Sequence, residues 1–186
     1  ASLQIGAGHV VRCLALAQAL QARGARVHFV CRELTAATRA QIESRDFELT
    51  LIPDSEITQR AARSHRDARM AVQGEDAAAT LMVLSGAEWD WLIVDHYALD
   101  AEWESILRAA TRHVLAVDDI ADRPHDCDIL LDQNLVQNMH ARDTGRGGTA
   151  ARQLLGPGYA LLRPEFRQLH SQTQPRKGPL RRVLVL

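Results

Sequence analysis

Three short apolar runs, each ending in aspartate, constrain the fold more than any other feature of this sequence. They lie at 91–95, 114–118 and 129–132. Apolar runs of this length without alternation are typical of strands buried on both faces, as in parallel sheets. A helix expected near 101–110 joins the first two runs into a β-α-β unit. The sequence therefore predicts an α/β fold with a doubly wound, mostly parallel, Rossmann-like sheet.

The residues before these runs repeat the same alternation of helix and strand. Apolar residues recur at helical spacing over 10–23, and Gly24 stands where a left-handed helix cap is expected. We also expect strands at 26–31 and 48–52, a helix at 36–44, and one or two helices in the Ala- and Arg-rich stretch 59–85.

The two ends of the chain predict a domain boundary. A glycine-rich loop that feeds a helix normally follows a strand, and no strand precedes Gly6. Residues 171–181 are polar and contain prolines and a glycine, which is typical of a linker, and 182–186 form an apolar run. We expect 1–170 to be one domain, 171–181 a linker, and 182–186 the first strand of a second, truncated domain.

Charge and composition narrow the class of partner. The net charge is −1 at pH 7, so no global basic field favours nucleic acid or an anionic membrane. No stretch approaches the roughly 18 consecutive apolar residues of a membrane-spanning helix. The three cysteines are widely spaced, which favours a reducing, cytoplasmic location.

Polar residues follow each expected strand, at the sheet edge where open α/β sheets bind ligands. Gly6 and Gly8 let a ligand approach the backbone closely. His9 follows them at the start of the first helix, and a neutral histidine is a competent general base near neutral pH. The alternative is a tight structural turn with a capping histidine.

The clusters at 95–97 and 118–119 admit three interpretations. Their carboxylates and imidazole could bind sugar hydroxyls, hold a divalent metal, or cap helices and satisfy loop amides. The other histidines have no partner at ligand spacing, and we expect them to be surface or core residues: His28, His65, His113, His125, His140 and His170.

Five motifs in order resemble one family. They are SLQIGAGHVVRC at 2–13, VDHY at 94–97, DD at 118–119, CDILLDQN at 127–134 and GYALLRPEF at 158–166. This set resembles the PseG family, the UDP-2,4-diacetamido-2,4,6-trideoxy-β-L-altropyranose hydrolases of pseudaminic acid biosynthesis and flagellin glycosylation. The resemblance covers nearly the whole chain and the N-terminal half of the family. It implies a two-domain GT-B fold, similar to the MurG glycosyltransferase, with the nucleotide sugar between the domains.

The resemblance also implies a reaction and a set of site residues. Water displaces UDP from the anomeric carbon with inversion, His9 acts as the catalytic base, and no metal or other cofactor takes part. The implied partner is the UDP-sugar alone, with most UDP contacts in the second domain, and we expect a monomer. The residues implied in substrate binding are Gly6, Gly8, Arg12, Asp95, His96, Tyr97, Asp118, Asp119, Asn134 and Arg163.

Other functions stay open at this point. A GT-B glycosyltransferase or a spore-coat polysaccharide biosynthesis protein could use the same fold on another nucleotide sugar. A metal-dependent phosphoesterase could use Asp95, His96, Asp118 and Asp119. The chain by itself could also be an inactive binding half.

Overall fold

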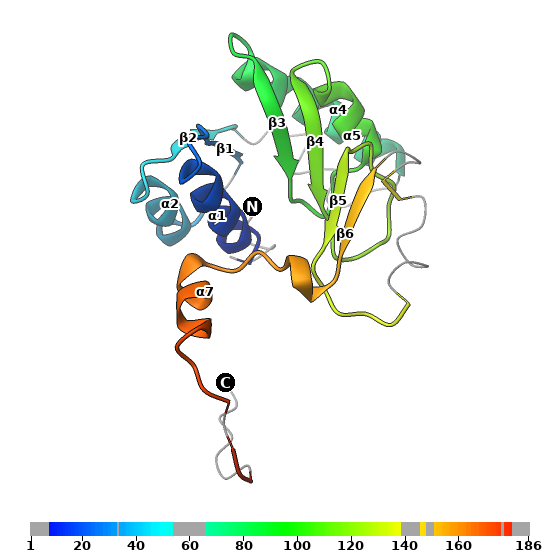
Figure 1. Cartoon of the computed structure of the whole chain (residues 1–186). Helices are drawn as coiled ribbons and strands as arrows, with labels where there is room; N and C mark the ends of the chain where they lie inside the picture. Colours follow the sequence, from blue (N-terminus) through cyan, green and yellow to red (C-terminus); the bar gives the residue numbers. More distant parts are fainter. Residues whose placement is uncertain are drawn as a thin grey trace.

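The chain forms an α/β structure in which every observed strand pair is parallel, as the apolar runs predict (Figure 1). The computed structural model describes residues 8–32, 34–53, 66–138, 146–147, 151–175 and 177–179. The helices are α1 (Gly8–Gln21), α2 (Ala36–Glu43), α4 (Arg66–Leu84), α5 (Ala101–Leu107), the 3-10 turn η1 (Pro157–Tyr159) and α7 (Pro164–His170). The strands are β1 (His28–Cys31), β2 (Glu48–Leu51), β3 (Trp89–Val94), β4 (Thr111–Val117), β5 (Ile129–Asp132) and β6 (Arg152–Leu155).

The strands form two sheets, a division that the sequence pattern does not reveal. One sheet pairs β1 with β2, and the other has the order β3-β4-β5-β6. The predicted β-α-β unit is present as β3, α5 and β4. Because all strands of the larger sheet run the same way, the residues that follow them emerge at one edge.

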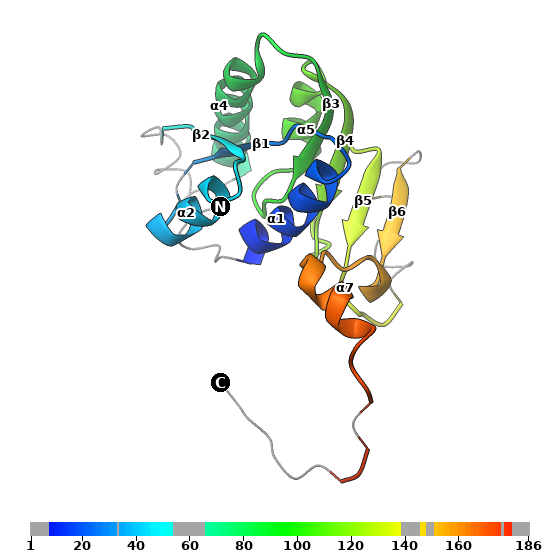
Figure 2. The ribbon, with the colours of Figure 1, turned by 60° about the vertical axis from the view of Figure 1, so that its left-hand side comes forward.

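Each sheet has its own hydrophobic core. Helices α4 and α5 pack on the four-stranded sheet, where Leu107 and Val114 are fully buried. Helices α1 and α2 pack with the two-stranded sheet around Leu14, Ile42 and Phe47. Helix α1 lies beside the larger sheet (Figure 2), and Arg12 near its N-terminal end joins the two cores through polar contacts with Asp95 and Asp119, which follow β3 and β4.

Local sequence sets where the helices begin and end. Gly24 has φ +89°, so the predicted left-handed residue after α1 is confirmed. The side chain of Asp100 accepts a hydrogen bond from the Glu102 backbone N–H and caps α5. The stretch 59–85 contains α4 from residue 66 onward, and its earlier part lies outside the described residues.

The C-terminal part leaves the body of the sheet. Helix α7 has no buried residue, and it extends below the carboxyl edge in Figure 1. Residues 171–175 and 177–179 contain no helix or strand, while the strand predicted at 182–186 lies outside the described residues. None of the described helices is long and apolar enough to cross a membrane.

Candidate active site

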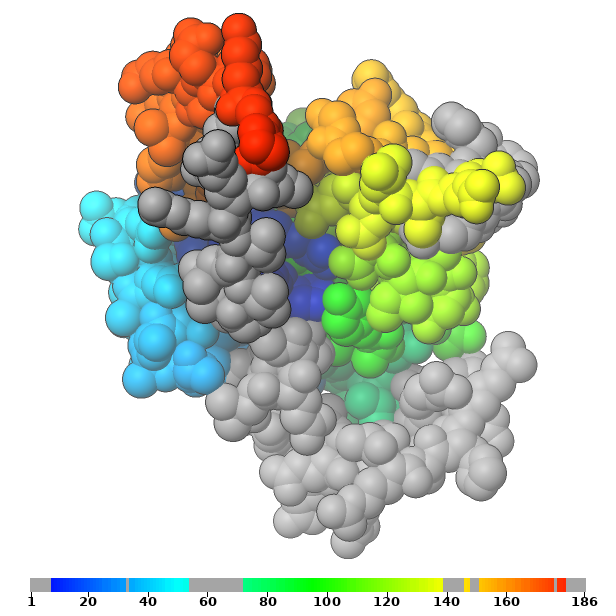
Figure 3. Space-filling view, turned by 90° about the horizontal axis from the view of Figure 1, so that it is seen from below, coloured from blue at the N-terminus to red at the C-terminus, as the bar shows by residue number. Residues whose placement is uncertain are grey.

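Two side chains of α1, those of His9 and Arg12, contact the carboxyl edge of the larger sheet. His9 and Arg12 lie three positions apart, so they share a helix face. Both are buried, with 5% and 8% of their surface exposed. Figure 3 looks onto this edge and shows α1 (dark blue) set back beside the green and yellow residues that follow β3, β4 and β5.

Both side chains contact Asp95, the residue directly after β3. Arg12 donates from Nε to Oδ2 and from Nη2 to Oδ1, each at 2.6 Å, and His9 Nδ1 contacts Oδ1. Burial raises the pKa of Asp95, but hydrogen bonds from Arg12 and His9 outweigh it and hold the pKa below its usual value. The carboxylate is therefore ionised and only accepts, so His9 Nδ1 carries the proton.

This tautomer leaves His9 Nε2 as the basic nitrogen. Nε2 is buried and has no hydrogen-bond partner among the residues that the structure describes. A buried polar atom without a partner costs free energy, and in native proteins it often marks a position that a ligand or water occupies. The arrangement suits a base whose Nδ1 is held by a carboxylate and whose Nε2 has its lone pair unpaired.

Tyr97 contacts His9, and Asp119 contacts Arg12. The Tyr97 ring meets the imidazole edge to face, with centroids 4.4 Å apart, and 38% of Tyr97 is exposed. Asp119 Oδ2 accepts from Arg12 Nη1 at 2.8 Å. Burial and the neighbouring Asp119 raise the pKa of Tyr97, so its hydroxyl stays protonated and can donate.

A half-buried thiol, Cys13, also contacts Asp95. Cys13 Sγ lies 3.4 Å from Asp95 Oδ2. Burial and Asp95 raise the pKa of Cys13 well above its ordinary value. The group is therefore a neutral thiol and not a nucleophile.

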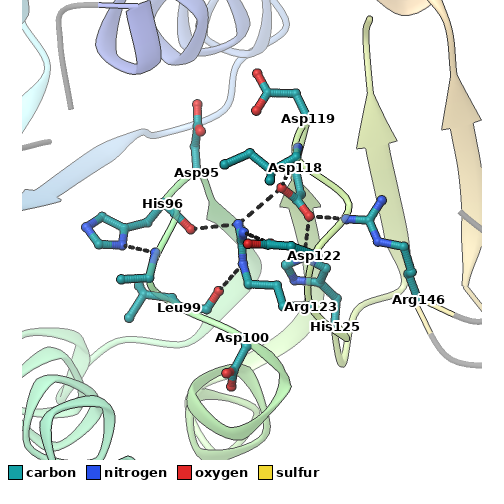
Figure 4. Close-up of polar contacts among 12 residues, drawn as sticks. Asp95, His96, Leu99, Asp100, Asp118, Asp119, Asp122, Arg123, His125 and Arg146 are labelled. Carbon is teal, nitrogen blue, oxygen red and sulfur yellow. Dashed lines mark hydrogen bonds and ion pairs between the residues drawn. The ribbon is translucent and has the colours of Figure 1, made fainter. Parts of the chain in front are cut away.

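Asp118, directly after β4, is fully buried behind its own loop (Figure 4). Its carboxylate accepts from the Ile120 N–H at 3.1 Å and from His125 Nε2 at 3.1 Å, and it pairs with Arg123 and Arg146. Burial raises the pKa of Asp118, but these donors hold it well below its usual value. Because cationic and N–H donors surround the carboxylate, the geometry favours a supporting role for Asp118.

His125 continues this network to α5. Its Nδ1 donates to Glu104 Oε1 at 2.7 Å, and Glu104 Oε2 accepts from the Asp126 N–H at 2.6 Å. Burial lowers the pKa of His125, but Asp118 and Glu104 outweigh it and raise the pKa. With a carboxylate at each ring nitrogen, His125 is a core imidazolium.

Three other predicted site residues lie apart from the His9–Asp95 contact. His96 Nδ1 accepts from the Ala98 N–H, and burial lowers the pKa of His96 to about 4. Asn134 is exposed, and its Nδ2 reaches the Asp119 carbonyl at 3.5 Å. Arg163 is exposed and lies over the Phe166 ring at 5.3 Å.

Of the two glycines in the predicted loop, only Gly8 lies among the described residues. Gly8 begins α1, directly before His9, and a Cβ added there would meet no atom within 4 Å. Gly6 lies outside the described residues.

The side chains considered as possible metal ligands do not converge on one position. Arg12 holds both oxygens of Asp95, and the Asp118 carboxylate faces cationic side chains. Across the described part of the chain, no group of three or more His, Cys, Asp or Glu side chains is arranged to hold a metal ion.

Sequence reasoning missed Glu104, Arg123 and Arg146, and it missed the partners of His125. Glu104 lies 21 positions from His125, on a helix where a glutamate ordinarily faces solvent. No local spacing could have found this pair. Within this network, only Asp118 could be identified from local sequence, because it directly follows a strand and therefore lies at the ligand-binding edge of the sheet.

Comparison with known proteins agrees with the motifs. The chain is 26% identical over 180 residues to the UDP-2,4-diacetamido-2,4,6-trideoxy-β-L-altropyranose hydrolase of Campylobacter jejuni. The predicted resemblance to the PseG family is confirmed. The match covers 95% of this chain and 54% of the hydrolase, so the chain spans about half the length of that relative. No family model and no solved structure matches.

Proposed function

We propose that this protein hydrolyses the anomeric C–O bond of a UDP-activated, N-acetylated deoxy sugar, with His9 as the general base. The observation that carries the proposal is the buried His9 Nε2, which has no partner in the described part of the chain while Nδ1 is held by Asp95. The similarity to a UDP-sugar hydrolase supports the substrate class.

The chemistry follows from the tautomer of His9. Nε2 takes a proton from a water molecule as the water oxygen bonds to the anomeric carbon. The bond from that carbon to the diphosphate oxygen breaks on the opposite face, so the configuration inverts and UDP departs with the bonding electrons. Asp95 stabilises the imidazolium that forms, and Arg12 keeps Asp95 ionised through two 2.6 Å hydrogen bonds.

UDP is a good leaving group, so the reaction needs neither a strong general acid nor a metal. Helix α1 begins at Gly8, beside His9, and the N-terminal end of a helix favours negative charge nearby. Tyr97 is partly exposed and lies against His9, and Asp119 accepts a hydrogen bond from Arg12. We assign them the sugar hydroxyl and amide groups, with Asn134 and His96 at the margin.

The proposal includes a division of labour along the protein. Residues 1–170 supply the base and the sugar side of the site, and a second domain beyond 171–181 supplies the uridine pocket and most diphosphate contacts. The chain spans about half of the hydrolase that it matches, which supports this division. The proposal also has the protein act as a monomer, in the cytoplasm, in pseudaminic acid biosynthesis.

The test uses the protein expressed from its complete reading frame. The UDP-sugar is supplied without an acceptor, and the anomeric proton is followed by NMR. Release of free sugar with inverted configuration supports the proposal. Absence of turnover until an acceptor alcohol is added would instead indicate a glycosyltransferase, and EDTA-sensitive cleavage of simple phosphodiesters would indicate a phosphoesterase.

The role of His9 has its own test. His9→Ala should lower kcat by about 100-fold or more, because it removes the base. His113→Ala is the matched control, since His113 is half exposed and its ring packs at a tilt against Trp91, away from the site. Full activity in His9→Ala would remove His9 from this role.

A further inference from the structure

Arg123 is a nearly buried arginine that belongs to none of the motifs. It lies in the segment between β4 and β5, and 10% of its side chain is exposed. A buried guanidinium is costly unless its donors are paired, and the structure pairs donors on all three of its nitrogens. Its partners lie on two different loops (Figure 4).

Two of these partners are backbone carbonyls in the loop after β3. Arg123 Nε donates to the Leu99 carbonyl at 2.8 Å, and Nη2 donates to the His96 carbonyl at 3.0 Å. Tyr97 lies between these two carbonyls, and Asp95 directly precedes them. The guanidinium therefore contacts the backbone on both sides of Tyr97, starting one residue after Asp95.

The other partners belong to the loop after β4. Arg123 Nη2 lies 3.2 Å from Asp118 Oδ1, and Nη1 donates to Asp122 Oδ1 at 2.7 Å. Asp118 is in turn held by His125, whose other ring nitrogen is tied to Glu104 of α5. This end of the contact is thus anchored in the core.

We propose that Arg123 is a positioning residue that holds the Asp95–Tyr97 segment in register with the loop carrying Asp119, so that Tyr97 stays against the His9 imidazole. The inference rests on the proposed function for its kinetic consequence, but its structural consequence can be measured without substrate. Since a displacement of about 1 Å in a catalytic group can cost 100-fold, we expect the loss to fall on kcat more than on KM.

The variants are Arg123→Met, which removes every donor, and Arg123→Lys, which retains one cationic donor. Arg108→Met is the control, because Arg108 ties the far end of the same β4–β5 segment to α5. Arg108 donates hydrogen bonds to Asp126 and Asp128, and it makes none of the contacts that Arg123 makes to residues 95–99. Thermal unfolding reports the general loss of stability in all three.

The substrate-free readout is 19F NMR with 3-fluorotyrosine. The 186-residue sequence contains two tyrosines, Tyr97 and Tyr159, and Tyr97→Phe identifies the Tyr97 signal in the spectrum of the protein expressed from its complete reading frame. We expect Arg123→Met to shift or broaden the Tyr97 signal and lower kcat by about 10- to 100-fold, with Arg123→Lys between it and wild type. Arg108→Met should leave both unchanged.

The inference is overturned if Arg123→Met lowers the stability but leaves the Tyr97 signal as in wild type. If the Met variant does not fold, the same criterion applies to Arg123→Lys. It is also overturned if Arg108→Met moves that signal equally. If the wild-type protein has no activity toward UDP-sugars, the proposed function fails, and the Tyr97 signal still decides the role of Arg123.

Discussion

Replacing Asp95 by Asn tests the central contact of the site, because it removes one charge and leaves the side-chain volume nearly the same. Asp95 has 3% of its side chain exposed and accepts from Arg12, His9 and Cys13. The amide that replaces one oxygen donates hydrogen bonds, so it opposes either the Arg12 donors or the His9 Nδ1–H.

The magnitude for stability follows from burial and from what Arg12 retains. Removing one partner of a buried ion pair costs about 3–5 kcal/mol. Arg12 keeps its 2.8 Å hydrogen bond to Asp119, so we expect a loss near the lower end of that range. The free energy of unfolding should therefore fall by about 3 kcal/mol, measured by urea unfolding.

The magnitude for activity follows from the His9 tautomer. Without an ionised carboxylate at Nδ1, the imidazole is free to turn or to place its proton on Nε2, where it cannot act as a base. We expect kcat to fall by about 100-fold, equivalent to about 2.7 kcal/mol in the barrier, with a small change in KM. The assay is release of UDP by the protein expressed from its complete reading frame.

Asp76→Asn provides the matched control. Asp76 is a largely buried carboxylate that pairs with Arg32 at 2.5 Å and accepts from Trp103 Nε1 at 2.9 Å, with no contact to His9. It should lose stability while kcat stays within about twofold of wild type. Wild-type kcat in Asp95→Asn, or an equal loss of kcat in Asp76→Asn, would refute the assignment of Asp95.

Two further predictions concern pH and ligand binding. The pKa of His125 is raised in the folded state, so its ion pairs stabilise the fold fully below its ordinary pKa of about 6.5 and cease to do so as pH rises through the folded pKa. The stability gap between wild type and His125→Gln should therefore shrink as pH rises above about 6.5 in urea unfolding, and a constant gap would contradict the imidazolium between Glu104 and Asp118. Isothermal titration of the 186-residue chain with UDP should give negligible heat, since the proposal assigns the uridine pocket to a second domain, and micromolar affinity would contradict that division.

Much of the secondary structure could be predicted because it depends on local patterns. The apolar runs ending in aspartate correspond to β3, β4 and β5, and α1, α2 and α5 begin within two residues of their predicted starts. Gly24 at the end of α1 follows from backbone sterics alone. The split into two sheets could not be predicted, because strand partners are chosen by packing between segments that are distant in sequence.

The sequence by itself determined which polar residues directly follow the apolar runs, because the residues after parallel strands emerge at the carboxyl edge of their sheet. Asp95 and Asp119 follow from that rule, whereas the place of His9 beside them depends on how α1 packs. Only the tertiary structure decided what these residues contact: Arg12 faces two carboxylates, and Asp118 lies behind its loop against His125. Hydrogen bonds between residues 83 or 107 positions apart leave no local pattern, so the roles within the site depend on the packing of α1 against β3 and β4.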